Sequence, residues 1–191
     1  MKNRLISTLV FMTLFGCSNS QKDIKISESN IKPGTEIKVR GKVHALSPGH
    51  LEVGENFIEK TKKTDINFAF KNKATVISIV PSIDTPVCEA QTHLMGETNG
   101  LKDLDLVIIS RDLPMAQTRF AKEAKLENLT YLSDYKSGSM GSLGLKIKGS
   151  ELLARGVVVL DKEGIVRYMQ FVEEVTDLPN MPKAFAFANA L

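Results

Sequence analysis

Cysteine is scarce in this sequence, with only Cys17 and Cys88 among 191 residues. No CxxC pair or Cys/His group has the spacing of zinc ligands, which argues against a structural metal site. Two distant cysteines also argue against an internal disulfide framework. The scattered histidines, His44, His50 and His93, are more typical of surface or packing positions than of catalysis. No metal or other cofactor is expected, and a lone thiol is the reactive group to examine.

Tryptophan is absent, and neither sign of charge dominates. The formal net charge is +3, but Lys2 and Arg4 belong to the N-terminal segment; without residues 1–16, 23 basic and 22 acidic side chains remain, a net charge of +1. No basic stripe carries interleaved aromatic residues, so the sequence gives no support for nucleic-acid binding. A chain of 191 residues with 42 % hydrophobic composition suits one globular domain with a sizeable core.

No apolar run in the N-terminal segment is long enough to span a membrane. Leu5 to Phe15 gives 11 apolar or small residues after a short basic stretch, which is typical of a signal peptide. Residues 14–17, Leu-Phe-Gly-Cys, resemble a bacterial lipobox, in which cleavage precedes the cysteine and the cysteine carries the lipid. We expect residues 1–16 to be a lipoprotein signal peptide and Cys17 to be lipidated. The alternative is an ordinary signal peptide that leaves Cys17 as a free thiol.

The residues after Cys17 are polar and lack apolar periodicity, so we interpret 17–30 as a flexible tether and 31–191 as the folded domain. This organisation predicts a lipid-anchored protein of the bacterial cell envelope, facing the periplasm. Ser18 rather than aspartate after the cysteine weakly favours the outer membrane.

Apolar periodicity in the body predicts an α/β domain. The order is a hairpin, then β-α-β-α-β-loop-β-β-α, which is typical of a thioredoxin-like fold with a central mixed sheet flanked by helices. Residues 65–70 are ambiguous. The expected elements are a hairpin within 31–46, an extended piece at 51–58, strands at 74–80, 104–110, 129–132, 155–161 and 165–172, helices at 87–98, 115–126 and 179–191, and a loop with a helical turn at 136–149.

The stretch Pro81 to Cys88 joins a predicted buried strand to a predicted helix. Thr85 is a suitable N-cap and Pro86 suits the first helical position, which places Cys88 third in the helix. The unpaired N–H groups and the dipole of a helix N-terminus favour a thiolate there. Cys88 is therefore a candidate nucleophile.

Several sequence blocks resemble one protein family. Pro81, Thr85 and Cys88 form a P-x-x-x-T-x-x-C pattern, and PSIDT-x-VC is the form found in the thiol peroxidase branch of the peroxiredoxins. Three further blocks, at 112–120, 152–159 and 174–177, resemble the same branch and follow in the same order. The resemblance covers roughly residues 35–191.

The resemblance implies a thiol peroxidase that reduces hydrogen peroxide and organic or lipid hydroperoxides. It implies that Cys88 attacks a peroxide oxygen and becomes a sulfenic acid. Thr85 would exchange a hydrogen bond with the sulfur or the substrate, and Arg155 would align the thiolate with the O–O bond. Pro81 would shape and shield the substrate loop. Taken alone, Thr85 is also compatible with a simple N-cap and Arg155 with a charge at a strand end. The relatives commonly form dimers, so a homodimer is expected.

Position 121 departs from the family pattern in a way that bears on the reaction. Ala121 occupies the place where these enzymes usually carry a resolving cysteine. We therefore expect a single-cysteine cycle, in which an external thiol, either a small molecule or a thioredoxin-like protein, reduces Cys88. If Cys17 is not lipidated, it is a second candidate to resolve Cys88. A non-catalytic redox sensor or binding module on the same scaffold is the alternative function. A cysteine hydrolase using His93 has less support, because no third orienting group is apparent.

Overall fold

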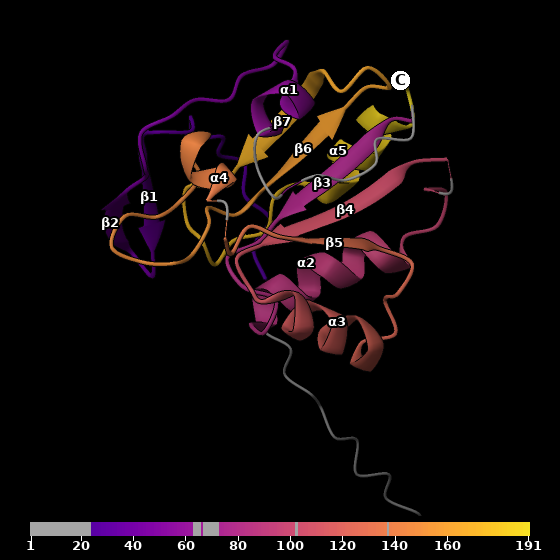
Figure 1. Ribbon diagram of the computed structural model, residues 1–191, viewed down its shortest axis with the longest axis horizontal. Coiled ribbons are helices and arrows are strands. Elements are labelled where there is room, and N and C mark those ends of the chain that lie inside the picture. Colours follow the sequence, from indigo (N-terminus) through magenta and orange to yellow (C-terminus); the bar gives the residue numbers. More distant parts are fainter. Residues whose placement is uncertain (1–23, 63–65, 67–72, 102, 137) are drawn as a thin grey trace, which may run out of the picture.

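The computed structural model describes residues 24–62, 66, 73–101, 103–136 and 138–191. Its centre is a five-stranded sheet with the order β5-β4-β3-β6-β7 (Figure 1). Within this sheet β3, β4 and β5 run parallel, and β6 and β7 are antiparallel to their preceding neighbours. The strands are β3 (Thr75–Ile79), β4 (Asp105–Ser110), β5 (Thr130–Ser133), β6 (Gly156–Leu160) and β7 (Val166–Phe171).

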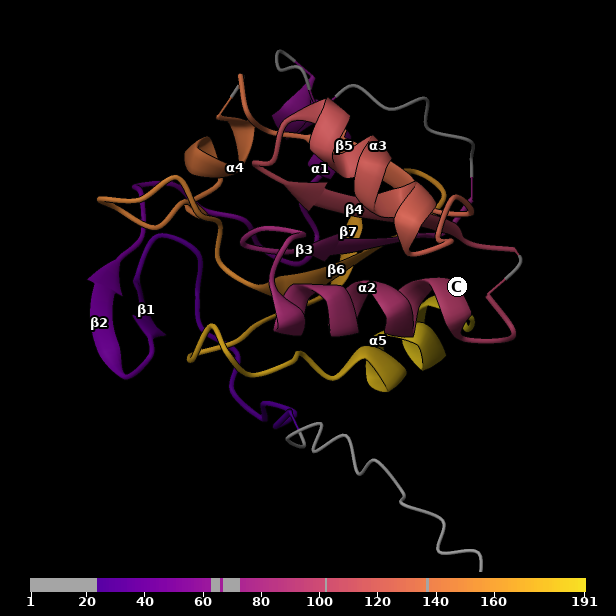
Figure 2. The ribbon, with the colours of Figure 1, turned by 90° about the horizontal axis from the view of Figure 1, so that it is seen from below.

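Helices cover both faces of the sheet. On one face, α2 (Pro86–Glu97) and α5 (Met181–Ala188) lie side by side (Figure 2), and α3 (Pro114–Glu123) packs along β5 at the sheet edge. On the other face lie α1 (Phe57–Thr61) and α4 (Ser139–Ser142). The hairpin of β1 (Glu36–Val39) and β2 (Lys42–Ala45) packs beyond the end of the sheet.

The strand that leads to Cys88 shows why the sheet is central. All five residues of β3 are buried, and its apolar residues are divided between two clusters, one on each face of the sheet. Val76 packs with α2 and α5, whereas Ile77 and Ile79 face the side of α1 and α4. A strand buried on both faces is a continuous apolar run rather than an alternating one. The sheet therefore holds the start of the Cys88 loop rigidly.

The structure confirms the predicted thioredoxin-like fold, the N-terminal hairpin and the five strands of the main sheet. The extended piece predicted at 51–58 is wrong at its end, because α1 begins at Phe57. The side chain of Asn56 accepts a hydrogen bond from the Glu59 N–H at 2.9 Å, and this cap starts the short helix. Within the ambiguous stretch, residues 65 and 67–70 lie outside the described residues.

The segment before the hairpin corrects the domain boundary. Residues 25–30, which we assigned to the tether, pack against β7, an edge strand of the sheet, and against the chain that follows it. The Ser27 N–H donates to the Leu178 carbonyl at 2.7 Å, and Asn30 Oδ1 accepts from the Phe171 N–H at 3.0 Å. The polar side chains that resemble a linker in the sequence satisfy the edge of β7. From Lys25 onward the chain is therefore hydrogen-bonded to the folded domain.

The remaining N-terminal predictions concern residues outside the described part of the chain: the signal peptide 1–16, Cys17 and the rest of the tether. Within the described residues, no helix is long and apolar enough to cross a bilayer.

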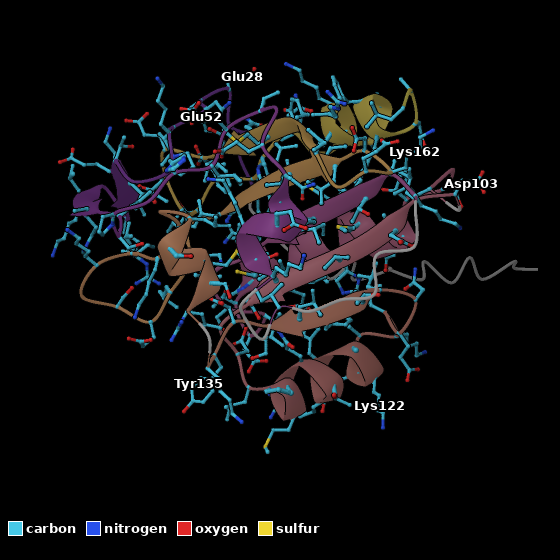
Figure 3. All side chains as sticks on the ribbon, turned by 45° about the horizontal axis from the view of Figure 1, so that its top comes forward. Glu28, Glu52, Asp103, Lys122, Tyr135 and Lys162 are labelled. Carbon is cyan, nitrogen blue, oxygen red and sulfur yellow. The ribbon has the colours of Figure 1, made fainter. Side chains whose placement is uncertain are left out.

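Charged side chains labelled in Figure 3, such as Glu28, Lys122 and Lys162, project outward from elements on different sides of the domain.

Candidate active site

Cys88 lies in the first turn of α2, immediately after the loop that leaves β3. Pro86 is the first helical residue and Thr85 has extended backbone angles at the N-cap, so Cys88 is third in the helix, as predicted. The Thr85 side chain makes no capping hydrogen bond. Instead, its hydroxyl lies 2.9 Å from the Cys88 sulfur and donates to it. Thr85 is therefore a hydrogen-bond donor to the sulfur as well as a helix N-cap by backbone conformation.

The loop itself is held by an aspartate that follows β4. One Asp112 carboxylate oxygen accepts from the Ser82 hydroxyl at 2.7 Å, and the other accepts from the Ile83 N–H at 2.9 Å. Pro81 is buried at the start of this loop. These contacts fix the path of the chain between β3 and α2, and so fix where Thr85 and Cys88 stand.

Arg155 reaches the same sulfur from the residue just before β6. Its Nη2 atom lies 3.2 Å from the Cys88 sulfur. Both residues are almost fully buried, with 0 % of Cys88 and 2 % of Arg155 exposed. The structure thus brings together Cys88, Thr85 and Arg155, the three residues for which the family resemblance implied a part in the reaction.

Two groups that the sequence analysis missed hold the guanidinium of Arg155 in place. Nη1 donates to Gln91 Oε1 at 2.9 Å, and Nε donates to the Val175 carbonyl at 2.7 Å. Gln91 is itself fixed, because its amide nitrogen donates to Ser78 Oγ at 2.8 Å. Gln91 lies three residues after Cys88, which puts both on one face of α2, so helical spacing is a signal that was available. A backbone carbonyl such as that of Val175 leaves no such signal.

Burial has an electrostatic consequence for Arg155. Removal from water disfavours its charged form and lowers its pKa, while the neighbouring Cys88 sulfur acts in the opposite direction. An arginine nevertheless stays protonated in proteins. The site therefore consists of a sulfur that accepts two hydrogen bonds, one from a hydroxyl and one from a fixed, water-excluded cation. Such donors stabilise negative charge that develops on a reacting atom.

The other candidate groups lie apart from this cluster. His93 pairs with Glu97 at 2.7 Å and approaches Glu89 at 3.8 Å, so its ring nitrogens serve surface carboxylates rather than Cys88. Ala121 is a nearly buried residue of α3. Among the described residues, no group of three or more His, Cys, Asp or Glu side chains is arranged to hold a metal ion.

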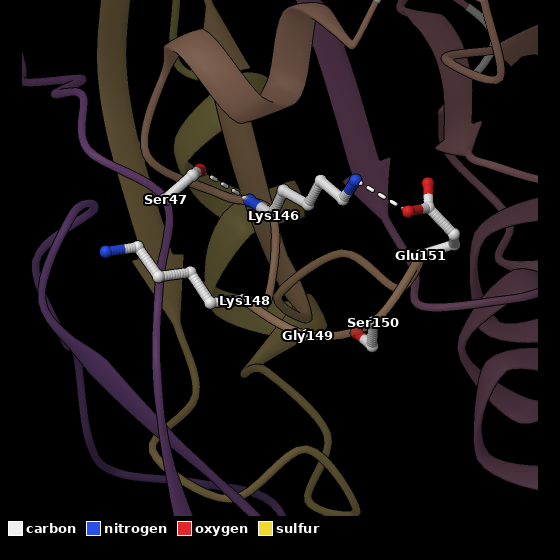
Figure 4. A pocket seen from close by; sticks show the side chains of 6 residues that line it. All are labelled: Ser47, Lys146, Lys148, Gly149, Ser150 and Glu151. Atoms are coloured by element: carbon white, nitrogen blue, oxygen red, sulfur yellow. Dashed lines mark hydrogen bonds and ion pairs between the residues drawn. The ribbon is translucent and has the colours of Figure 1, made fainter.

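A separate surface hollow of about 530 Å³ lies on the loop between α4 and β6 (Figure 4). Within it, Lys146 Nζ pairs with Glu151 at 2.8 Å, so much of its charge is neutralised internally. Cys88, Thr85 and Arg155 do not line this hollow, which is bordered by Ser47, Lys146, Lys148, Gly149, Ser150 and Glu151.

Comparisons with known proteins identify the family of the chain. The Redoxin family matches residues 55–185 of the chain. The thiol peroxidase of Bacillus subtilis (strain 168) is 41 % identical over 167 residues, covering 82 % of this chain and 98 % of the relative. The thiol peroxidase of Aquifex aeolicus (strain VF5) is 36 % identical over 153 residues, covering 75 % and 90 %.

Solved structures show the same relationship. The crystal structure of a peroxiredoxin-like protein from Aquifex aeolicus superposes with a TM-score of 0.72 at 32 % identity, covering 83 % of this chain and 98 % of that chain. The thiol peroxidase from Chromobacterium violaceum, at 15 % identity and a TM-score of 0.65, shares the fold. The chain described here therefore belongs to the Redoxin family and is a peroxiredoxin-type oxidoreductase, a thiol peroxidase.

Proposed function

We propose that this thiol peroxidase reduces hydrogen peroxide and organic or lipid hydroperoxides through a sulfenic acid on Cys88. The Cys88 thiolate attacks the distal peroxide oxygen, the O–O bond breaks, and the alkoxide or hydroxide that leaves takes up a proton to become an alcohol or water. The observation that carries the proposal is the placement of two hydrogen-bond donors, from Thr85 and Arg155, on one buried sulfur.

Each of the other residues has a proposed role in that step. Thr85 donates to the thiolate and is the solvent-exposed neighbour of the sulfur, so substrate approaches from its side. Arg155 stabilises the charge that develops on the leaving oxygen. Pro81, which is buried at the start of the loop between β3 and α2, shapes and shields that loop.

We infer that an external thiol completes the cycle. Position 121 is alanine, and Cys88 is the only cysteine of the sequence after Cys17. A small thiol or a thioredoxin-like protein would attack the sulfenic acid, releasing water and forming a mixed disulfide. A second thiol would then release Cys88 as a thiol and carry away the disulfide. Because Cys88 is fully buried, the first turn of α2 must open before a protein thiol can reach it.

Turnover measurements test the single-cysteine cycle. We expect the wild-type protein to consume hydrogen peroxide and cumene hydroperoxide continuously with at least one reductant from a panel of small thiols and thioredoxin-like proteins, and Cys88→Ser to consume neither. A single-turnover burst that no reductant restarts would favour the redox sensor instead. Absence of any burst, with Cys88 unmodified, would refute peroxide reduction altogether.

Mass analysis after one equivalent of peroxide separates the two resolving routes. A sulfenic acid, or a mixed disulfide with an added thiol, supports the external reductant. An internal Cys17–Cys88 disulfide in the mature chain would instead support resolution from the N-terminal segment and would contradict lipidation of Cys17.

We also propose that Cys17 anchors the enzyme in the bacterial envelope by a lipid, facing the periplasm, with lipid hydroperoxides as accessible substrates. The lipobox-like residues 14–17 support this. Fractionation tests it: wild-type protein should follow the membrane fraction, and Cys17→Ser should not.

A homodimer is proposed as well, since Leu113, Met115 and Tyr135 leave 41 %, 75 % and 51 % of their surface exposed. Sedimentation at micromolar concentration would reveal a monomer if this is wrong.

A further inference from the structure

The chain that follows β7 presents one backbone carbonyl to the site. The Val175 carbonyl accepts the hydrogen bond from Arg155 Nε at 2.7 Å. Because this acceptor belongs to the backbone, its position depends on how residues 173–178 are held rather than on the Val175 side chain. The direction of the guanidinium relative to Cys88 therefore depends on the contacts of this segment.

The β1–β2 hairpin holds this segment by backbone hydrogen bonds on both sides of Glu174, the second of them at the Val175 N–H. The Lys38 N–H donates to the Glu173 carbonyl at 2.7 Å, and the Val175 N–H donates to the Lys38 carbonyl at 2.9 Å. One peptide chain thus links the hairpin to the carbonyl that receives Arg155. This hairpin lies outside residues 55–185, the part matched by the Redoxin family.

The Glu174 carboxylate makes a further contact with the hairpin, at its turn. Arg40 and Gly41 both have positive φ, at 50° and 77°, so their successive N–H groups point to the same side and form an anion-binding concavity. The Glu174 carboxylate fills it, accepting from the Arg40 N–H at 3.0 Å and the Gly41 N–H at 2.8 Å. Partial burial opposes ionisation of Glu174, but these hydrogen bonds and that from Thr176 outweigh it and lower its pKa. At neutral pH the Glu174 carboxylate is therefore ionised.

We propose that Glu174 is a positioning residue for the peroxidase reaction, because its carboxylate fastens the β1–β2 turn to the segment that presents the Val175 carbonyl to Arg155. Without this contact, the turn loses its anion and the peptide of Val175 gains freedom on the hairpin side. Arg155 Nε follows its acceptor, and Nη2 moves relative to the sulfur. The inference rests on the role proposed above for Arg155.

The neighbouring Glu173 provides a matched control. Glu173 pairs with Lys38 at 2.6 Å, and both side chains are about half exposed, so Glu173→Gln removes a carboxylate from the same segment without touching the turn. We expect Glu174→Gln to reduce the rate of peroxide reduction roughly threefold to tenfold, and Glu173→Gln to stay within about twofold of wild type. Glu174→Asp, which keeps the charge but is one methylene shorter, should resemble Glu174→Gln.

A double-mutant cycle with Arg155→Ala distinguishes positioning from general loosening of the fold. If Glu174 acts through Arg155, Glu174→Gln should lower the rate by less than about twofold in the Arg155→Ala background. A repeated threefold to tenfold loss there would overturn the proposal, as would a single Glu174→Gln variant with the wild-type rate. Failure of the proposed function would look different, since the wild-type protein itself would then reduce no peroxide.

Discussion

Replacement of Arg155 by alanine separates two ways in which this residue can assist Cys88. A nearby cation favours the thiolate, and a fixed donor stabilises the oxygen that leaves when the O–O bond breaks. Arg155 is placed for both, since Nη2 lies 3.2 Å from the sulfur and the other guanidinium nitrogens are held by Gln91 and the Val175 carbonyl. The two contributions differ in size and in pH dependence.

The ionisation effect has a ceiling. A free thiol with a pKa near 8.5 is roughly 7 % ionised at pH 7.4, so complete ionisation raises the thiolate fraction only about tenfold. A more acidic thiol is also a weaker nucleophile, with a Brønsted slope of about 0.4–0.5, which offsets much of that gain. Loss of one preorganised donor to a developing oxyanion, in contrast, lowers a rate by about 10²–10³.

We therefore expect Arg155→Ala to reduce the second-order rate of hydrogen peroxide reduction by more than about 10² at pH 7.4. At pH 9.5, where a thiol of ordinary pKa is about 90 % ionised, the loss should still be at least about 10². The protein has no tryptophan whose fluorescence could follow oxidation of Cys88. A suitable assay is therefore rapid quenching with an alkylating agent, followed by intact mass analysis. Recovery to within tenfold of the wild-type rate at pH 9.5 would refute the argument.

Stability must be measured in parallel. Removal of the guanidinium leaves Gln91 Oε1 and the Val175 carbonyl without this partner, and an unsatisfied buried acceptor costs about 1–3 kcal/mol. Arg155→Lys keeps a charge, but one ammonium group cannot replace a planar fork that bonds in three directions. We expect it to be folded and to remain at least about tenfold slower than wild type at both pH values.

Variants at three further positions test individual contacts. Thr85→Val keeps the shape but removes the 2.9 Å hydrogen bond to the Cys88 sulfur, so the peroxide rate should fall by about tenfold to a hundredfold, whereas Thr85→Ser should stay within about threefold of wild type. Gln91→Ala removes the acceptor of Arg155 Nη1, and both the rate, by about tenfold, and the free energy of unfolding, by about 2–4 kcal/mol, should decrease in kinetic and urea experiments. Burial opposes ionisation of Asp161, but hydrogen bonds from the β6–β7 turn and from Arg167 outweigh this effect, and the net result is a lowered pKa. The ionised carboxylate therefore stabilises the fold at pH values above about 3.9, the pKa of an aspartate in the unfolded chain. This stabilisation is lost as the pH falls further, through the lower pKa of the folded state. Asp161→Asn should thus lose about 1–3 kcal/mol of unfolding free energy at pH 7, and the difference from wild type should narrow below about pH 3.9; a constant difference would contradict this assignment.

The sequence predicts the strands well because a buried strand consists mainly of apolar residues that are adjacent in the sequence. β3 and β6 are both covered on both faces. In β3 only Thr75 and Ser78 are polar, and in β6 four apolar residues follow Gly156. The short helix α1 cannot be predicted from periodicity, since five residues make little more than one turn. Its signal is the pair Asn56 and Glu59, a side-chain cap rather than an apolar pattern.

The N-terminal segment shows a different limit. Ser27 and Asn30 are polar and lie among other polar residues, so composition alone indicates a linker. Their partners on β7 and in the chain beyond it are about 140–150 residues away. Only the three-dimensional structure places an edge strand with unpaired hydrogen-bonding groups beside them. Long-range satisfaction of this kind has no local sequence pattern.

The residues of the site also differ in whether a local sequence pattern reveals them. Pro81, Thr85 and Cys88 are close in sequence. The apolar run before Pro81 indicates a strand, and Thr85 followed by Pro86 indicates a helix N-terminus with the thiol in its first turn. Arg155 enters the sequence argument only through the family resemblance, because its partner is 67 residues away. Gln91 was accessible through helical spacing. The Val175 carbonyl was not, because any residue at that position supplies the same group.

These supporting groups follow from one physical requirement. A guanidinium that is 2 % exposed has lost its water, and desolvation of a charge is unfavourable by several kcal/mol unless hydrogen bonds replace the water. Gln91, the Val175 carbonyl and the Cys88 sulfur together accept bonds from Nη1, Nε and Nη2. The same three bonds that make burial of the charge tolerable also fix its direction. Orientation of Arg155 and stability of the fold are therefore linked, and a control such as Glu173, on the same segment but outside this network, is needed to separate them.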